Sequence, residues 1–370
     1  MKLIRTIDAE GAVLCHDITQ IIKGVTKDAV FRKGHIVTKE DIPVLLSVGK
    51  DQLYVWEKQE GILHEDEAAE ILCRLCIGPG PQENTLDEKA AAEAPVKNME
   101  RSRAKEGKIE ITAACDGLLK VNRAGLKAVN SFGQMMIASR HGGFPVKTGD
   151  KLAGTRIIPL VIEEEKMTAA SEACMAATGG QPILSLHPFV HKKAGIVTTG
   201  NEVFYGRIED TFTPVVEAKL TEYDTEIIAR EMWNDDNEKV TAAIMRMIEA
   251  GADIVCCTGG MSVDPDDRTP LAIKNTGARI VSYGAPVLPG AMFMLAYYEV
   301  KDGPNPRTVT IMGLPGCVMY ARRTIFDLVL PHVMADDEIT AENLSSLGEG
   351  GLCLSCPVCT FPNCGFGKGH

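Results

Sequence analysis

Short apolar runs alternate with amphipathic stretches over the second half of the chain. Residues 194–199 and 253–258 are apolar and bounded by glycine, which is typical of buried strands. Between them, residues 237–250 carry apolar side chains at the spacing of one helix face: Val240, Ala243, Ile244, Met247 and Ile248. This alternation predicts βαβ units, hence parallel strands with helices on both faces of the sheet.

Weaker patterns extend the same domain on both sides. We expect helices over residues 219–233, 270–275 and 318–330, the last one stopped by Pro331. Strands are predicted near Ile280, at 292–298 and at 308–312. The fold class is therefore α/β, a three-layer domain with a mostly parallel sheet over residues 185–335.

The first half of the chain is predicted to be richer in strands. Glycine turns separate short apolar runs between residues 105 and 165, and Gly78-Pro-Gly-Pro81 divides two helices expected at 64–76 and 86–94. The predicted order is a small α+β module at 1–60, a helical connector at 61–104, a β-rich domain at 105–165, a linking helix at 166–184, the α/β domain at 185–335, and a linker with a cysteine-rich tail at 336–370.

Three of the predicted strands end in glycine-rich polar turns. These turns are Thr199-Gly200-Asn201-Glu202, Gly259-Gly260-Met261-Ser262 and Gly313-Leu314-Pro315-Gly316. In an open parallel sheet such strand ends meet at one edge, where ligands bind. Glycine also lets backbone N–H groups approach a ligand closely.

These turns, in this order, resemble the molybdopterin-binding domain of molybdopterin adenylyltransferases and molybdotransferases over roughly residues 185–335. The family pattern continues with a Lys-Pro-Gly segment, matched here by Leu288-Pro289-Gly290, and with a Tyr-Asp pair that includes Asp224. The resemblance implies a bound pterin phosphate, either molybdopterin or the molybdenum cofactor. It also implies catalytic roles for Glu202, Asp264 and Asp267 and Mg²⁺ held by such carboxylates.

The chain departs from the family pattern at three positions. Asn201 replaces a carboxylate, Leu288 replaces a lysine, and Cys317 stands in place of an asparagine. Losing the lysine removes a charge that would hold an anionic ligand. We therefore favour a cofactor carrier or accessory protein over a molybdotransferase-like enzyme. A molybdoenzyme client and a homo-oligomer are further partners that the resemblance implies.

The last residues carry a separate candidate site for a metal. Four cysteines follow one another as Cys353-x2-Cys356-x2-Cys359-x4-Cys364. The spacing is similar to an iron–sulfur run, and four-cysteine zinc is the rival, with Cys73 and Cys76 as another available pair. A redox protein that uses this cluster is one alternative function. A nucleotide pyrophosphatase-like enzyme, implied by other relatives of the domain, is another.

Composition restricts the classes of binding partner that we expect. The chain has 370 residues and a net charge of −11, which disfavours nucleic acid and anionic membranes as partners. No apolar run approaches the roughly 20 residues of a membrane span, and the first residues do not form a signal peptide. We expect a cytoplasmic protein. In that compartment, 12 cysteines indicate metal binding or free buried thiols rather than disulfides.

Overall fold

The computed structural model describes residues 2–22, 26–55, 60–78, 98–262, 268–301 and 306–369. The chain divides into two compact units. Unit 1 comprises Met1–Cys115, Val121–Arg140 and Thr148–Leu186, and unit 2 comprises Asp116–Lys120, His141–Lys147 and His187–His370. Two short segments within the range predicted as a β-rich domain thus group with unit 2.

The first part of unit 1 is small and rich in strands. Strand β1 (Lys2–Arg5) pairs antiparallel with β4 (Gln52–Val55), and β2 (Ile18–Ile22) pairs antiparallel with β3 (Thr26–Phe31). A 3-10 turn (Thr6–Asp8) and helix α1 (Asp41–Ser47) complete it. Apolar side chains from these elements form their own core: Leu14, Ile18, Leu45 and Leu53.

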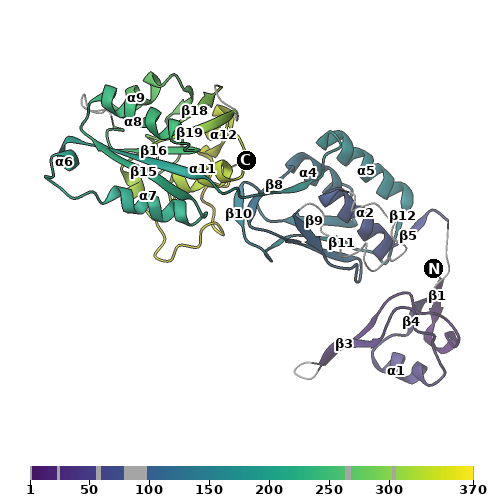
Figure 1. Ribbon diagram of the computed structural model, residues 1–370. Coiled ribbons are helices and arrows are strands. Elements are labelled where there is room, and N and C mark those ends of the chain that lie inside the picture. The colour runs from purple at the N-terminus through teal and green to yellow at the C-terminus, as the bar shows by residue number, and fades with distance from the viewer. Residues whose placement is uncertain are drawn as a thin grey trace. The chain divides into compact units, whose positions relative to one another are not determined.

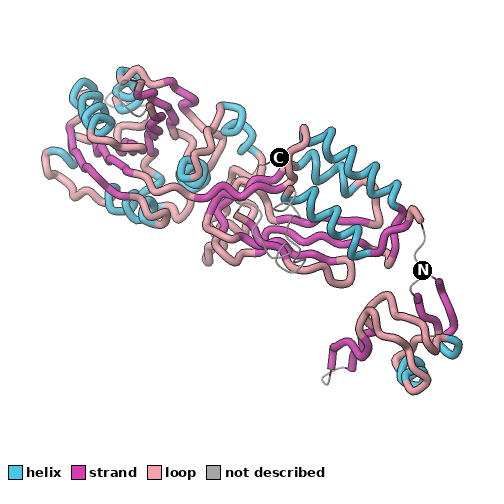
Figure 2. The backbone as a smooth tube through the Cα atoms, turned by 45° about the vertical axis from the view of Figure 1, so that its right-hand side comes forward, coloured by secondary structure: helices cyan, strands magenta, loops and turns pink. Residues whose placement is uncertain are grey.

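The rest of unit 1 places helices beside an antiparallel sheet (Figure 2). The sheet has the order β6 (Met99–Arg101), β7 (Lys108–Ala113), β11 (Lys151–Ile157) and β9 (Met135–Ser139). A second pair joins β5 (Ile62–His64) to β12 (Val161–Glu163). The helices are α2 (Glu65–Ile77), α4 (Arg123–Asn130) and α5 (Glu164–Thr178). The His64 side chain accepts from Asp66 N–H and so caps α2, which begins as expected.

Unit 2 is built on a six-stranded sheet (Figure 1). The order is β15 (Glu226–Trp233), β14 (Lys193–Thr199), β16 (Ile254–Thr258), β19 (Arg307–Leu314), β18 (Met294–Val300) and β17 (Arg279–Tyr283). The first four strands are parallel, whereas β18 is antiparallel to both of its neighbours. The mostly parallel sheet predicted from the sequence is confirmed.

Helices cover both faces of this sheet, as Figure 1 shows for α7 and α8. One face packs against α8 (Asn237–Glu249) and α9 (Thr269–Asn275), and the other against α7 (Phe212–Thr221) and α11 (Ile325–Met334). Successive strand residues point to opposite faces, so Cys256 joins one core and Cys257 the other. The shorter elements are α6 (Asn201–Phe204), α10 (Cys317–Tyr320), α12 (Ala341–Ser345), a 3-10 turn (Ser346–Gly348), β8 (Gly117–Val121), β10 (Phe144–Val146) and β13 (Leu184–Pro188).

Two predicted helices of the α/β domain are wrong in part. The range 219–233 contains the end of α7 and then edge strand β15, because Ile227, Ile228 and the residues after them alternate along a half-buried strand. The range 318–330 is divided into α10 and α11, and Pro331 lies inside α11. The helix predicted over 86–94 lies outside the described residues. No helix in the described part of the chain is both long and apolar enough to cross a bilayer.

Candidate functional site

Parallel register brings the glycine turns of unit 2 to one edge of the sheet. Thr198 at the end of β14 pairs with Thr258 of β16, and Thr258 pairs with Leu314 of β19. Three turns that are far apart in sequence therefore begin side by side at the carboxyl ends of adjacent strands. We call this the carboxyl edge. It is the place where ligands bind in open α/β sheets.

The middle turn of the carboxyl edge requires glycine at two positions. Gly259 has φ of +80°, and a Cβ atom there would overlap the carbonyl oxygen of Thr199. Gly260 has φ of +53°, and a Cβ atom there would lie 2.9 Å from Thr269 Oγ1. Both conformations are rare for residues with side chains, and both positions are closed to them by contact. The backbone of this turn is thus packed directly on the end of β14.

Polar groups are concentrated near the same strand ends. The Thr199 and Thr269 hydroxyls are 3.0 Å apart and hydrogen-bonded. The Asn201 N–H donates to Asp235 at 3.0 Å, and Glu202 is exposed. The hydroxyl of Thr258 is fully buried and has no hydrogen-bond partner among the described residues. A buried hydroxyl without a partner is costly, so a polar group brought by a ligand would stabilise it.

The remaining turns reach the carboxyl edge through β18 and β19. Met294, the first residue of β18, pairs with Gly313 of β19. Pro289 and Gly290 come shortly before Met294 in the sequence, so they lead into β18 at this edge. Gly290 is buried, and a Cβ atom there would lie 2.5 Å from Ile325 Cγ2. Gly313, Leu314 and Pro315 are also buried, whereas Gly316 is exposed. The buried residues of these turns therefore pack beneath the carboxyl edge, and Gly316 is exposed to solvent.

The structure does not bring every predicted residue to this edge. Asp224 precedes β15, whose first residues align with the beginning of β14, so Asp224 lies at the opposite edge of the sheet. The Met261 side chain is buried in the core against Gly313, and only its backbone remains to contribute, while Ser262 is exposed. Asp264 and Asp267 lie outside the described residues.

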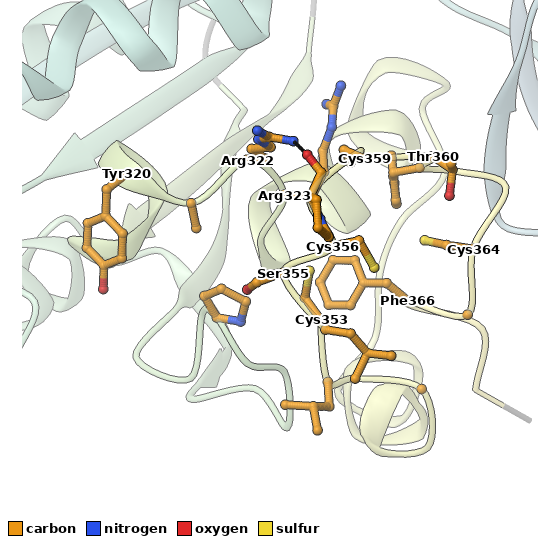
Figure 3. Close-up of a pocket in the computed structure, with 18 residues that line it drawn as sticks. Tyr320, Arg322, Arg323, Cys353, Ser355, Cys356, Cys359, Thr360, Cys364 and Phe366 are labelled. Carbon is orange, nitrogen blue, oxygen red and sulfur yellow. Dashed lines mark hydrogen bonds between the residues drawn. The ribbon is translucent and has the colours of Figure 1, made fainter.

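A second candidate site in unit 2 is formed by the tail. Cys353, Cys356, Cys359 and Cys364 all line one cavity of about 570 Å³ (Figure 3). We call it the cysteine cavity. Cys356 and Cys359 are exposed, and the other two are half-buried. Among the described residues, no three His, Cys, Asp or Glu side chains are close enough together to hold a single metal ion.

The cysteine cavity is also lined by Arg322 and Arg323, which were not predicted as part of a site. They contribute from the segment before α11, and Pro289, which was predicted to bind the pterin cofactor, contributes from the loop that leads to the carboxyl edge. Arg322 donates to the carbonyl of Pro357 at 2.8 Å, and the Arg323 guanidinium lies over the Phe361 ring. The sequence does show two adjacent arginines after a glycine-rich turn. They precede the cysteines by some thirty residues, so the sequence alone does not connect them with the cysteine cavity.

The cysteines outside the cavity are poor candidates for ligands or nucleophiles. Burial raises the pKa of Cys257 to about 12 and also raises that of Cys256. Desolvation raises the pKa of Cys317, contrary to the lowered pKa that a helix start would give, and α10 has only four residues. Cys73 and Cys76 are fully buried on α2 of unit 1.

Comparisons with known proteins find a family match over the α/β domain of unit 2. Residues 195–335 match the family model of a probable molybdopterin binding domain, and residues 3–57 match a domain of unknown function. A CinA-like protein of Mycobacterium tuberculosis is 34% identical over 80 residues, which are 22% of this chain and 19% of that protein. The equivalent protein of Mycobacterium leprae is 32% identical over 80 residues, with 22% and 19% covered. The chain thus spans about a fifth of the length of these curated relatives.

Solved structures with similarity to this chain include the tungsten cofactor synthesizing protein MoaB from Pyrococcus furiosus. That match has 21% identity and a TM-score of 0.33, and covers 40% of this chain and 98% of the other. A molybdenum cofactor biosynthesis protein from the same organism covers 90% of this chain and 62% of its own, at 12% identity and a TM-score of 0.25. Residues 195–335, which form the α/β domain of unit 2, are thus similar to a probable molybdopterin binding domain.

The carboxyl edge fits an anionic pterin ligand in its chemistry. Gly259 and Gly260 have no room for a Cβ atom, so the backbone of this turn lies directly against the end of β14 and Thr269. Thr258 supplies a buried hydroxyl that has no hydrogen-bond partner among the described residues. Backbone N–H groups and hydroxyls are suitable donors for a phosphate or a pterin ring. The edge can therefore bind and orient such a ligand without a charged side chain.

Proposed function

We propose that unit 2 binds molybdopterin or the molybdenum cofactor at its carboxyl edge and acts as a carrier or accessory protein in molybdenum-cofactor biosynthesis. The observation that carries the proposal is the register of β14, β16 and β19, which aligns three glycine turns. The match of residues 195–335 to a probable molybdopterin binding domain supports the ligand class. A molybdoenzyme client would receive the cofactor.

The carrier role is favoured over a molybdotransferase-like activity by one position. Leu288 is exposed where the resembling family has a lysine, so this chain lacks a cation to hold an oxyanion there. In the transferase alternative Glu202, which is exposed close to Gly200, would bind Mg²⁺. The resemblance implies the same role for Asp264 and Asp267. The transferase alternative predicts Mg²⁺-dependent loss of adenylate from adenylated molybdopterin when molybdate is added. The carrier role predicts binding without that turnover.

The decisive experiment is equilibrium binding of molybdopterin to the full chain under anaerobic conditions. Gly260→Asp should weaken binding by at least about tenfold, because its side chain would fill the turn and place a negative charge against an anionic ligand. Gly277→Asp is the matched control. Gly277 also has positive φ, a Cβ atom there would meet no other atom within 4 Å, and the residue precedes β17 at the opposite edge.

The control variant should bind like the unmodified chain. Circular dichroism and urea unfolding of both variants separate a lost site from a lost fold. An intact chain without measurable affinity for molybdopterin would remove the proposal. Equal weakening by both substitutions would move the ligand away from the carboxyl edge.

A further inference from the structure

The tail holds its four cysteines on a fixed backbone. Leu288 N–H donates to the Gly351 carbonyl and Cys353 N–H donates to the Leu288 carbonyl, each at 2.8 Å. Farther along, Gly367 N–H donates to the Gly350 carbonyl at 3.0 Å, which closes residues 350–367 into a loop. These bonds attach the tail to the loop before Pro289. The thiols are therefore presented by an ordered segment and not by a loose chain end.

Two of the thiols are anchored inside the fold and two face outward. Cys353 and Cys364 pack against the hydrophobic core of unit 2, next to the buried Phe366. Cys356 and Cys359 are exposed on the other part of the lining. Ser355, with φ of +49°, makes the sharp turn between the first two cysteines. Figure 3 labels the four cysteines and Phe366 among the residues that line this cavity.

The charge of the lining suits an anionic occupant. Arg322 and Arg323 line the cysteine cavity, and no Asp or Glu is among its described lining residues. Arg323 already pairs with Asp327 at 2.8 Å, whereas Arg322 makes no salt bridge with a described residue. Four thiolates bring four negative charges, and the Arg322 guanidinium beside them, which pairs with no described carboxylate, reduces the cost of that charge.

The spacing of the thiols favours a cluster over a single ion. Zinc holds four thiolates at about 2.3 Å from one ion, which brings the sulfurs to about 3.8 Å from each other. In this chain no such single-ion group exists among the described residues, and the thiols line about 570 Å³ instead. A cube of four iron and four sulfide ions lies between its cysteines and keeps them farther apart.

From this geometry we infer that Cys353, Cys356, Cys359 and Cys364 bind one four-iron, four-sulfide cluster in the cysteine cavity. The four thiols lose four protons to solvent as the four iron–sulfur bonds form. Two ferrous ions, two ferric ions and four sulfide ions come from outside the chain, so the cluster forms without an oxidant or a reductant and the chain is neither oxidised nor reduced. Cys353 and Cys364 form the inner side of the site, the exposed pair closes it, and Arg322 offsets the negative charge. This site stands independently of pterin binding.

The test is metal analysis of the full chain after anaerobic reconstitution with iron salt and sulfide. We expect a brown protein with about four iron atoms and four sulfides per chain. Replacing both exposed ligands, Cys356→Ala with Cys359→Ala, should lower the iron content at least about tenfold, since changes beyond the direct ligands already cost that much. Both side chains are exposed, so the double variant should keep its fold, which circular dichroism checks.

Cys115→Ala is the matched control because Cys115 is a half-buried cysteine of unit 1 and does not line the cavity. It should keep the full iron content. Stoichiometric zinc without iron in the reconstituted chain would overturn the cluster in favour of a structural ion. A colourless, metal-free chain would overturn the site as a whole. Iron retained by the double variant would overturn the ligand assignment.

Discussion

The carboxyl edge and the cysteine cavity are two candidate sites of the same unit that differ in the chemical groups they offer. The carboxyl edge consists of the ends of buried parallel strands and offers mainly backbone groups and hydroxyls. The cysteine cavity consists of irregular chain and offers thiols and guanidinium groups. A backbone site depends on glycine and on register, so it tolerates changes in exposed side chains. A site made of side chains has the opposite sensitivity, and mutation should separate the two.

The largest effect should come from the buried ion pair that supports the arginine segment of the cavity. Lys219 Nζ lies 2.6 Å from Asp327 Oδ1, and both side chains are nearly buried. Asp327→Asn should lower the free energy of unfolding by about 3–5 kcal/mol, because Lys219 would keep a buried charge without its partner. Urea unfolding measures this change.

The control for this prediction is an ion pair on the surface of the same unit. Arg279 pairs with Glu338, and both side chains are more than half exposed. Glu338→Gln should change the free energy of unfolding by less than about 1 kcal/mol. Similar losses from both variants would contradict the supporting role assigned to the Lys219–Asp327 pair.

The next effect tests the backbone side of the comparison. Gly259→Ala should destabilise the chain by about 1–3 kcal/mol more than Gly251→Ala, because only the former would overlap Thr199. Both glycines have positive φ, so the backbone strain is similar in the two variants and the contact differs. Denaturant midpoints compare them directly. Equal destabilisation would mean that the turn adjusts, and that the close approach to β14 is unnecessary.

The smallest effect concerns the missing charge near the carboxyl edge. Leu288→Lys should strengthen molybdopterin binding about two- to fivefold, equivalent to about 0.5–1 kcal/mol for an exposed charge. Val190→Lys adds the same charge at an exposed position before β14, at the opposite edge of the sheet, and should leave affinity nearly unchanged. Titrations at low and high salt measure both, and the gain should shrink at high salt. An identical gain in the control would indicate a general effect of net charge.

The sequence predicted the sheet of unit 2 more fully than its edges. Buried strands such as β16 consist of apolar residues bounded by glycines, so pattern and structure agree. Edge strand β15 is half-buried, and its spaced apolar residues are equally compatible with one face of a helix. The division between α10 and α11 depends on Thr324, whose side chain caps α11 together with Asp327. The apolar pattern alone predicts one helix that stops at Pro331, which instead lies inside α11.

The candidate sites were predictable to different extents for the same reason. Glycine turns at consecutive parallel strands must share an edge, so Gly200, Gly259 and Gly316 could be grouped without coordinates. Asp224 could not be placed, because its position depends on whether the following segment is a helix or a strand. The cysteine spacing predicted one common location. The contribution of Arg322 and Arg323 required the fold, since the loop at Leu288 brings the tail beside them.

The distribution of thiols between core and tail has a practical consequence for labelling. Cys256 and Cys257 are enclosed on opposite faces of the sheet, with thiol pKa values raised by burial, so alkylating reagents will not reach them while the chain is folded. Cys356 and Cys359 are the exposed cysteines of the described chain. A maleimide dye would therefore mark the tail first, and the rate of marking would report directly whether those two sulfurs are already occupied.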